Sequence, residues 1–475
     1  MQVDFLRPQA ATVGCMAKPP HPPADSMQPL HSLDDLDLRA LAAILLGVAL
    51  GSLDTAIANT ALPTIAAALQ ASPAASIWVI NAYQLAIVAT LLPFAALGDR
   101  VGPRRVFLGG LAVFTVASLA CAGADTLALL AGARALQGIG ASGVMSVNIA
   151  LIRLIFPASR LGRGVGLNAL VVGVSFALGP TLASLVLSVA SWPWLFAINV
   201  PLGMVALGLA VPALPRTAAR DHPFDWIAAL MTATCFAALI FGLGALAQRT
   251  PIWLVGYPLA TAFCAGFLLL RRQAGHPAPM LPVDLLRRPL FALSALTSMA
   301  SFTAQGLAFV ALPFYFEQVL HRNPVDTGFL MTPWPIIVAL AAPIAGRLSD
   351  QRYSPGLLGG IGLAILGAGL ASLAWLPADP GALAIVLRMA ICGGGFGLFQ
   401  APNLKALMAS APPERSGGAS GVIAMARLLG QTTGAALVAL CFGLSGSHGS
   451  TVALALGAGF AVLASTASFS RLYLH

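Results

Sequence analysis

The chain has 475 residues, of which 58% are hydrophobic and only 9% are charged. So few charged side chains cannot cover the surface of a water-soluble protein of this length, so the composition excludes an ordinary soluble enzyme and indicates an integral membrane protein. The formal net charge of +9 does not indicate nucleic-acid binding, because the basic residues are dispersed in short loops rather than gathered into one stripe.

Residues 1–37 are Pro-rich and polar, and we expect a disordered N-terminal tail without a removable secretory signal. The six cysteines are scattered, with no close pair and no spacing typical of metal ligands. We therefore expect neither a disulfide framework nor a metal site.

Fourteen apolar stretches follow, each near the ~20 residues that a membrane-spanning helix needs. They are separated by Pro, Gly or charged residues and lie near 41–62, 76–97, 106–124, 127–152, 165–190, 194–212, 226–246, 252–270, 291–316, 328–345, 357–377, 381–404, 418–443 and 449–468. The sequence therefore predicts an all-α membrane protein of about 14 transmembrane helices.

The loops between these stretches differ in charge. Alternate loops carry nearly all of the basic residues: Arg100, Arg104, Arg105, Arg153, Arg160, Arg163, Arg216, Arg220, Arg271, Arg272, Arg287, Arg288, Arg347, Arg352, Lys405 and Arg415. The other set of loops holds only Arg249 and Arg322. Because cytoplasmic loops carry the excess of Lys and Arg, we expect cytoplasmic N- and C-termini and a location in the cytoplasmic (inner) membrane.

Two sequence echoes indicate an internal duplication. GDRVGPRR at 98–105 is echoed by GRLSDQRYSPG at 346–356, and RALQGIGASG at 134–143 by RMAICGGGFG at 388–397. In both pairs the second motif follows the first after nearly the same number of residues, which predicts two related six-helix bundles. We place them at 38–215 and 281–475, with an inserted two-helix linker at 216–280.

These residues resemble the major facilitator superfamily, and more narrowly its fourteen-helix drug:proton antiporter branch of EmrB/QacA type. LDTAIANTALP at 53–63 is similar to the helix 1 signature of that branch, and the loop at 98–105 to the loop motif of the superfamily. SWPWLFAINVPLG at 191–203 is similar to a further element of the branch. The resemblance implies the major facilitator fold, with two pseudo-symmetric bundles and two inserted helices.

The resemblance also implies roles for particular residues. Arg134, Gln137 and Gly138 match a helix 4 pattern that the family associates with proton transfer. The antiporter motif of helix 5 is matched only loosely, by Gly166, Gly179 and Pro180, which we interpret as helix-packing residues.

The loop motif supplies a candidate conformational latch. Its residues are Asp99, Arg100, Gly102 and Arg104, with Asp350 at the echoing position. Asp99 lies at a helix junction where it can accept hydrogen bonds from a neighbouring helix N-terminus and hold one conformer closed. The alternative is a solvated loop acid.

Asp54 is the acid that lies deep within an apolar stretch. A carboxylate in a low-dielectric interior is poorly tolerated while ionised unless a cation is near, so this side chain can take up and release protons as access alternates. Arg134 has about the same depth in helix 4, which allows the two side chains to meet. We interpret Asp54 and Arg134 as proton-coupling residues, and the alternative is a static ion pair.

Other polar and aromatic side chains in the apolar stretches are candidates for a substrate cavity, although each can also serve as a contact between helices. They are Asn59, Tyr83, Gln84, Asn148, Phe176, Phe302, Gln305, Phe309 and Gln400. Arg388 and Arg427 belong to the same set, with structural clamping of backbone carbonyls as the alternative.

No nucleotide-binding or hydrolase motif occurs in the sequence, so we expect no enzyme activity, no cofactor and no nucleotide or nucleic-acid partner. The leading hypothesis is proton-coupled export of small amphipathic or drug-like molecules through a lipid bilayer by alternating access. Three intramembrane arginines against one deep acid suit neutral or anionic cargo as well as cations. The alternatives are a proton-coupled transporter of a specific metabolite and a membrane-embedded enzyme or sensor. A periplasmic adaptor and an outer-membrane channel remain open as partners.

Overall fold

A computed structural model describes residues 38–157, 160–216, 225–247, 251–273, 283–377, 379–411 and 416–473. Every regular element in these ranges is helical. The tail predicted at 1–37 lies outside the described residues, as do Arg220, Arg249 and Arg415.

The helices of the first half are α1 (Leu38–Ala68), α2 (Pro73–Ser76), α3 (Trp78–Val101), α4 (Pro103–Ala122), α5 (Leu127–Ile155), α6 (Leu161–Val189), α7 (Trp194–Ala197) and α8 (Asn199–Ala213). Two helices follow, α9 (Trp226–Ala247) and α10 (Ile252–Gln273). The second half contains α11 (Val283–Leu286), α12 (Pro289–Phe314), the π-helical turn η4 (Tyr315–Val319), α13 (Pro324–Met331), α14 (Pro333–Gln351), α15 (Pro355–Ala374), α16 (Ala382–Ser410), α17 (Ser416–Ser445), η6 (Gly446–His448), α18 (Gly449–Ser470) and η7 (Arg471–Tyr473).

Proline and hydroxyl side chains fix several helix starts. Pro103, Pro289 and Pro355 occupy the first turn of their helices, where the missing N–H is not needed for an intrahelical bond. The Thr126 hydroxyl caps α5 by accepting the Leu129 N–H at 3.3 Å. The residues that separate the apolar stretches in the sequence therefore also mark where these helices begin.

Twelve helical stretches in the described part of the chain are long and apolar enough to cross a membrane. The last of them, Gly421–Tyr473, includes both α17 and α18, and α9 supplies a shorter apolar stretch at Trp226–Leu239. The stretch expected at 328–345 consists of two helices, because α13 ends at Met331 and a new helix begins with Pro333.

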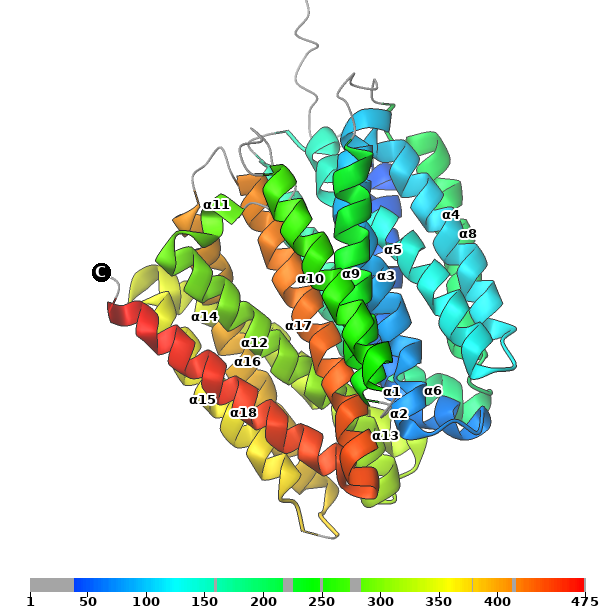
Figure 1. Cartoon of the computed structure of the whole chain (residues 1–475), viewed down its shortest axis with the longest axis vertical. Helices are drawn as coiled ribbons and strands as arrows, with labels where there is room; N and C mark the ends of the chain where they lie inside the picture. Colours follow the sequence, from blue (N-terminus) through cyan, green and yellow to red (C-terminus); the bar gives the residue numbers. More distant parts are fainter. Residues whose placement is uncertain are drawn as a thin grey trace, which may run out of the picture. The chain divides into compact units, whose positions relative to one another are not determined.

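The two halves repeat one pattern of helix neighbours. In the first half α4 contacts α5, α3 contacts α5, and α1 contacts both α6 and α8. In the second half α15 contacts α16, α14 contacts α16, and α12 contacts both α17 and α18. Figure 1 shows the two groups as separate bundles, with α1 to α8 in blue to green and α12 to α18 in yellow-green to red.

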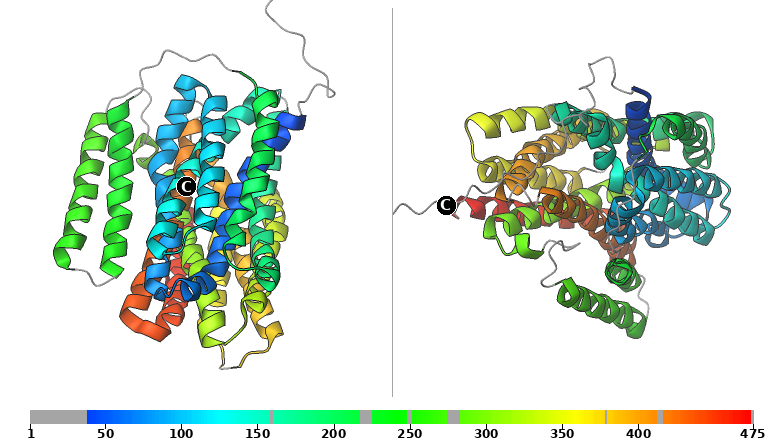
Figure 2. Two further views of the ribbon diagram at one scale, coloured as in Figure 1. Left: turned by 90° about the vertical axis from the view of Figure 1, so that its right-hand side faces the viewer. Right: turned by 90° about the horizontal axis from the view of Figure 1, so that it is seen from above.

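Helices α9 and α10 form a hairpin beside the two bundles, as the left view of Figure 2 shows. One helix of the hairpin, α9, contacts both α3 of the first half and α17 of the second. At its base the Arg272 guanidinium pairs with the Asp225 carboxylate at 3.0 Å. Hydrogen bonds from Arg272 and from the Ala228 N–H hold the pKa of Asp225 below its usual value.

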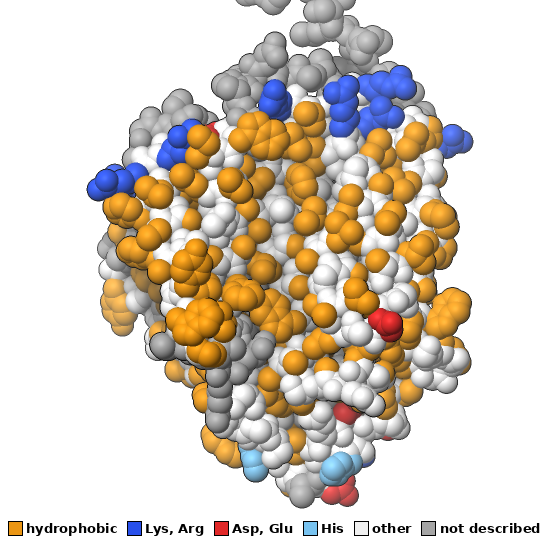
Figure 3. Space-filling model, turned by 45° about the vertical axis from the view of Figure 1, so that its right-hand side comes forward, with side chains coloured by type: hydrophobic (Ala, Val, Ile, Leu, Met, Phe, Trp, Pro, Cys, Tyr) orange, Lys and Arg blue, Asp and Glu red, His pale blue; other side chains and the backbone are white. Residues whose placement is uncertain are grey.

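The basic side chains gather at one end of the helices, seen at the top of Figure 3. We call this the basic end. It is where α3, α14 and α16 finish and α4 and α12 begin, and it includes Arg100, Arg104, Arg105, Arg288, Arg347 and Lys405. On the face that Figure 3 shows, apolar side chains are spread over the surface between the two ends and charged side chains are few there, as a bilayer requires.

Close contact between α4 and α5 depends on glycine. A Cβ added at Gly140 would lie 2.7 Å from the Gly110 carbonyl oxygen and would also collide with the backbone of Phe114. Gly132, two turns earlier in α5, has nothing within 4 Å of the same position. Small residues of this kind let membrane helices approach closely.

We expect Gly140→Ala to lower the free energy of unfolding by about 1–3 kcal/mol, because a methyl group overpacks the contact between α4 and α5. Gly132→Ala is the matched control, and we expect it to be neutral or stabilising because alanine is the better helix former. Thermal unfolding of the purified variants in one detergent measures both. Equal melting temperatures for the two variants would contradict the packing argument.

Candidate functional site

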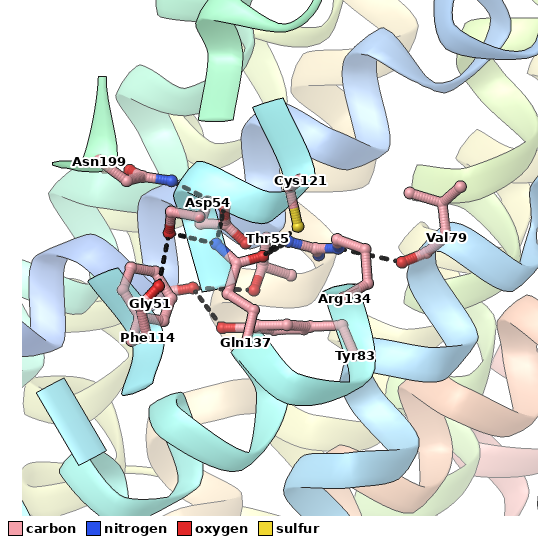
Figure 4. A network of polar contacts seen from close by, with 11 residues as sticks. Gly51, Asp54, Thr55, Val79, Tyr83, Phe114, Cys121, Arg134, Gln137 and Asn199 are labelled. Atoms are coloured by element: carbon pink, nitrogen blue, oxygen red, sulfur yellow. Dashed lines mark hydrogen bonds and ion pairs between the residues drawn. The ribbon is translucent and has the colours of Figure 1, made fainter. Parts of the chain in front are cut away.

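The Asp54 carboxylate lies at the centre of a buried polar network (Figure 4). Its side chain in α1 is 1% exposed. One oxygen accepts hydrogen bonds from Gln137 Nε2 of α5 and Asn199 Nδ2 of α8, each at 2.9 Å, and the other oxygen pairs with Arg134 of α5. Three donors therefore occupy the two oxygens of this one carboxylate.

Arg134 has acceptors besides Asp54. Its Nε donates to the Val79 carbonyl oxygen at 3.1 Å, and its Nη1 donates to Gln137 Oε1 at 2.6 Å. The guanidinium also lies over the Tyr83 ring, 4.1 Å from the centroid, which is a favourable cation–π contact. The cation therefore stays bound to neutral groups if Asp54 takes up a proton.

Gln137 connects this pair to α4. Its Nε2 donates to Ser118 Oγ at 2.9 Å, and the Cys121 thiol donates to its Oε1 at 3.5 Å. Ser118 in turn donates to the Phe114 carbonyl oxygen. Five helices, α1, α3, α4, α5 and α8, thus contribute to one network.

A small pocket lies next to the network, between the two halves. It is lined by Thr55, Asn59, Gln84, Phe176, Gln305, Gly306, Phe309, Val310 and Gln431. The free space is about 20 Å³, roughly the room that one water needs. A larger molecule enters only when the halves move apart.

Chain neighbours connect the pocket to the buried acid. Asp54 belongs to the network and Thr55 lines the pocket, while on α3 Tyr83 contacts Arg134 and Gln84 lines the pocket. Tyr83 and Thr55 both donate to the Gly51 carbonyl oxygen, at 3.3 and 2.9 Å. Helices α1 and α3 therefore carry residues of both the network and the pocket wall.

The halves also contact each other at the end opposite the basic end. Thr181 of α6 and Thr332, which precedes α14, share a hydrogen bond of 2.8 Å between their hydroxyls. Ser184 Oγ donates to the Val325 carbonyl oxygen of α13, also at 2.8 Å. These contacts close that end in the present conformer.

The loop residues predicted to form a latch lie at the basic end. Asp99 and Arg100 are exposed in the last turn of α3, and Gly102 has a φ of 93° between α3 and α4, a conformation that favours glycine. Arg104 donates to the Val211 carbonyl oxygen at 2.5 Å. In the second half, Asp350 pairs with Lys405 at 2.6 Å.

The predicted packing residues of α6 differ from one another. A Cβ at Gly179 would collide with Ala56 of α1, and the Pro180 carbonyl oxygen lies against Gly328 of α13. Gly166 has nothing within 4 Å. In the described structure, α6 therefore makes close helix contacts through its later part, near the pocket.

The other candidate cavity residues are spread over the two halves. Asn59, Gln84, Phe176, Gln305 and Phe309 line the pocket. Phe302 packs against Phe396, Asn148 donates to Asn168 at 3.2 Å, and Gln400 is exposed. Arg388 donates to the Ala384 carbonyl oxygen of its own helix, whereas Arg427 has no hydrogen bond or ion pair within the described residues.

Sequence reasoning did not select Ser118 and Asn199, which contact the network, or Thr55 and Gln431, which line the pocket. All four lie in predicted apolar stretches, and Thr55 and Asn199 also lie in quoted motifs. The sequence gives their depth in the membrane but not the direction in which the side chain points.

Comparison with known proteins identifies the class. The family model of the Major Facilitator Superfamily matches residues 44–435. The chain belongs to this superfamily of membrane transporters.

Three relatives are similar over most of their length. YebQ, an uncharacterized transporter of Escherichia coli (strain K12), is 52% identical, with 91% of this chain and 95% of the relative covered. The riboflavin transporter RibZ of Clostridioides difficile (strain 630) is 31% identical, over 85% and 88%. The tetracenomycin C resistance and export protein of Streptomyces glaucescens is 30% identical, over 84% and 74%.

We expect Arg134→Gln to destabilise the protein by about 3–5 kcal/mol, because it leaves the buried Asp54 carboxylate without its cation. The double variant Asp54→Asn, Arg134→Gln removes both charges, so most of that loss should be recovered. Unfolding of the purified variants in detergent gives the coupling free energy. The control is Arg388→Gln, whose guanidinium bonds within its own helix in the described structure. A double variant as unstable as Arg134→Gln would contradict the coupling.

Proposed function

We propose that this protein is a proton-coupled exporter of small amphipathic or drug-like molecules that works by alternating access. The observation that carries this proposal is the fully buried Asp54, one residue from Thr55 on the pocket wall between the halves. The similarity to the tetracenomycin C resistance and export protein supports export of drug-like molecules.

The proposed cycle uses the second set of acceptors around Arg134. When Asp54 is ionised, Arg134, Gln137 and Asn199 hold it. When Asp54 takes up a proton, its attraction to the guanidinium weakens, and Arg134 remains held by Val79 and Gln137. Because α1 and α3 carry both the network and the pocket wall, protonation favours a different arrangement of the halves, and substrate competes with that change.

We further propose fourteen membrane crossings, with α9, α17 and α18 each counted as one, and membership of the drug:proton antiporter branch. An even number of crossings puts both termini on one side. The gathering of Lys and Arg at the basic end supports a cytoplasmic location for that end in a cell membrane, by the positive-inside rule. The exposed Asp99 and Arg100, with Asp350 in the second half, are then positioned to join the halves when the basic end closes.

A proton-coupled transporter of a specific metabolite is the second candidate. The polar lining of the pocket and the similarity to a riboflavin transporter favour it. Both candidates use the same coupling residues and differ in the cargo.

We expect a suitable compound to discharge the proton gradient of everted membrane vesicles that contain the native protein, and not of vesicles that contain Asp54→Asn. The amide cannot exchange a proton, so coupling is lost while the side chain keeps its size. Quenching of a pH-sensitive dye measures the gradient after addition of amphipathic compounds that include riboflavin and tetracenomycin C. Glu317→Gln, near the opposite end of the second half, is the control and should behave as the native protein. Equal discharge by Asp54→Asn would refute the role of Asp54.

We expect a disulfide between Cys residues at positions 181 and 332 to stop transport reversibly. The hydroxyls of Thr181 and Thr332 lie 2.8 Å apart, so Thr181→Cys and Thr332→Cys in a background without the native cysteines suit the short Cβ–Cβ distance of a disulfide. The bridge holds the halves together at the end that has to open. Substrate-induced proton movement is measured before and after reduction, and each single variant is a control. Unchanged transport by the cross-linked protein would exclude alternating opening at this end.

A further inference from the structure

Among the described residues that line the pocket between the halves, none is a carboxylate. Four of its lining side chains are carboxamides, namely Asn59, Gln84, Gln305 and Gln431. Asp54, although close in the chain, is directed into the network and is occupied by donors from α5 and α8. A positively charged substrate in this pocket therefore finds no counter-ion among the lining residues.

Two of the carboxamides have unused hydrogen-bonding capacity. Asn59 and Gln84 are 6% and 4% exposed, and neither side-chain oxygen has a hydrogen-bond partner in the described part of the chain. Buried polar groups are normally paired, so these two oxygens are available to a ligand. Gln431 and Gln305, by contrast, already bond to each other at 3.2 Å across α17 and α12.

The aromatic part of the lining comes from both halves. Phe176 belongs to α6 and Phe309 to α12. A ring system bound between the halves would contact a phenyl ring on either side, with its polar edge toward the carboxamides.

Arg427 supplies a charge one helical turn from Gln431, a lining residue of this pocket. It lies four residues before Gln431 on α17, which places the two side chains one turn apart on neighbouring positions of the same helix face. Its guanidinium has no hydrogen bond or ion pair with any described residue, and its Nε is buried. The fully buried arginines of the described chain differ from the half-buried Arg427: Arg134 pairs with Asp54, and Arg471 donates to Asn403 Oδ1 at 2.6 Å and Ser294 Oγ at 3.0 Å.

We propose that the transported molecule is a small aromatic anion. Its ring system binds between Phe176 and Phe309, its polar edge binds Asn59 and Gln84, and its acidic group pairs with Arg427. This inference rests on the proposed function, since it assigns the substrate class of the same pocket. A cation bound at these residues would be repelled by Arg427 and would leave the carboxamides as its only polar partners.

Two dyes with the same xanthene ring and opposite charge test the proposal. Binding of carboxyfluorescein, an anion, and rhodamine 123, a cation, to the purified native protein in detergent is measured by fluorescence anisotropy. We expect carboxyfluorescein to bind at least tenfold more tightly. Arg427→Gln should weaken its binding at least tenfold, Arg427→Lys should retain most of the affinity, and Gln84→Leu should weaken it several-fold.

Arg271→Gln, an exposed arginine at the end of α10, is the matched control and should leave the dissociation constant unchanged. Elution volume and melting temperature show whether each variant is folded, and Arg427→Lys tests the site if Arg427→Gln fails to fold. The proposed substrate class would be overturned by tighter binding of rhodamine 123 than of carboxyfluorescein, or by no binding of carboxyfluorescein to the native protein. It would also be overturned if Arg427→Lys lost all binding of carboxyfluorescein. Binding of carboxyfluorescein to the native protein without discharge of the vesicle proton gradient would instead contradict the proton coupling and leave the substrate class standing.

Discussion

The structure of the first half depends on the need to hold an ionised carboxylate inside an apolar bundle. An unpaired charge there costs several kcal/mol, and the chain compensates Asp54 with donors from α5 and α8 rather than with one partner alone. Gln137 also donates to Ser118 of α4, so the position of α4 is linked to the same carboxylate. The relative positions of four helices are therefore fixed by one side chain, and the glycines that let α4 and α5 approach closely make that geometry possible.

The second half has a corresponding cluster with different chemistry. Arg471 is held by Ser294 of α12 and Asn403 of α16, the helices that occupy the places of α1 and α5 in the repeated neighbour pattern. All of its partners in the described residues are neutral. Such a cluster fixes helices without offering a carboxylate, so under the proposed function the coupling group belongs to the first half.

Much of the fold was predictable because hydropathy and charge report depth along the membrane normal. The apolar stretches predicted the helices, and equal depth suggested that Asp54 and Arg134 can meet. Rotation about each helix axis is a different quantity, which neighbouring helices set through packing. That is why Asn199 and Gln431 were not selected although their depth was known, and why Gly166 and Gly179 of one motif have different surroundings. The count of fourteen also exceeds the twelve stretches found by length and hydropathy, because α17 and α18 form one continuous apolar run and the apolar stretch of α9 is short.

The hydrogen bonds that close the end opposite the basic end are individually weak compared with the free energy of a buried ion pair. A hydrogen bond that is exchanged for water contributes only about 0.5–1.5 kcal/mol to stability, and the described side-chain bonds between the halves at that end are those of Thr181 and Ser184. Neutralising one member of a buried ion pair changes the free energy by an amount of the same order or larger. The second term is at least as large as the first, so in the proposed cycle the protonation of Asp54 is sufficient to shift the equilibrium between two arrangements of the halves.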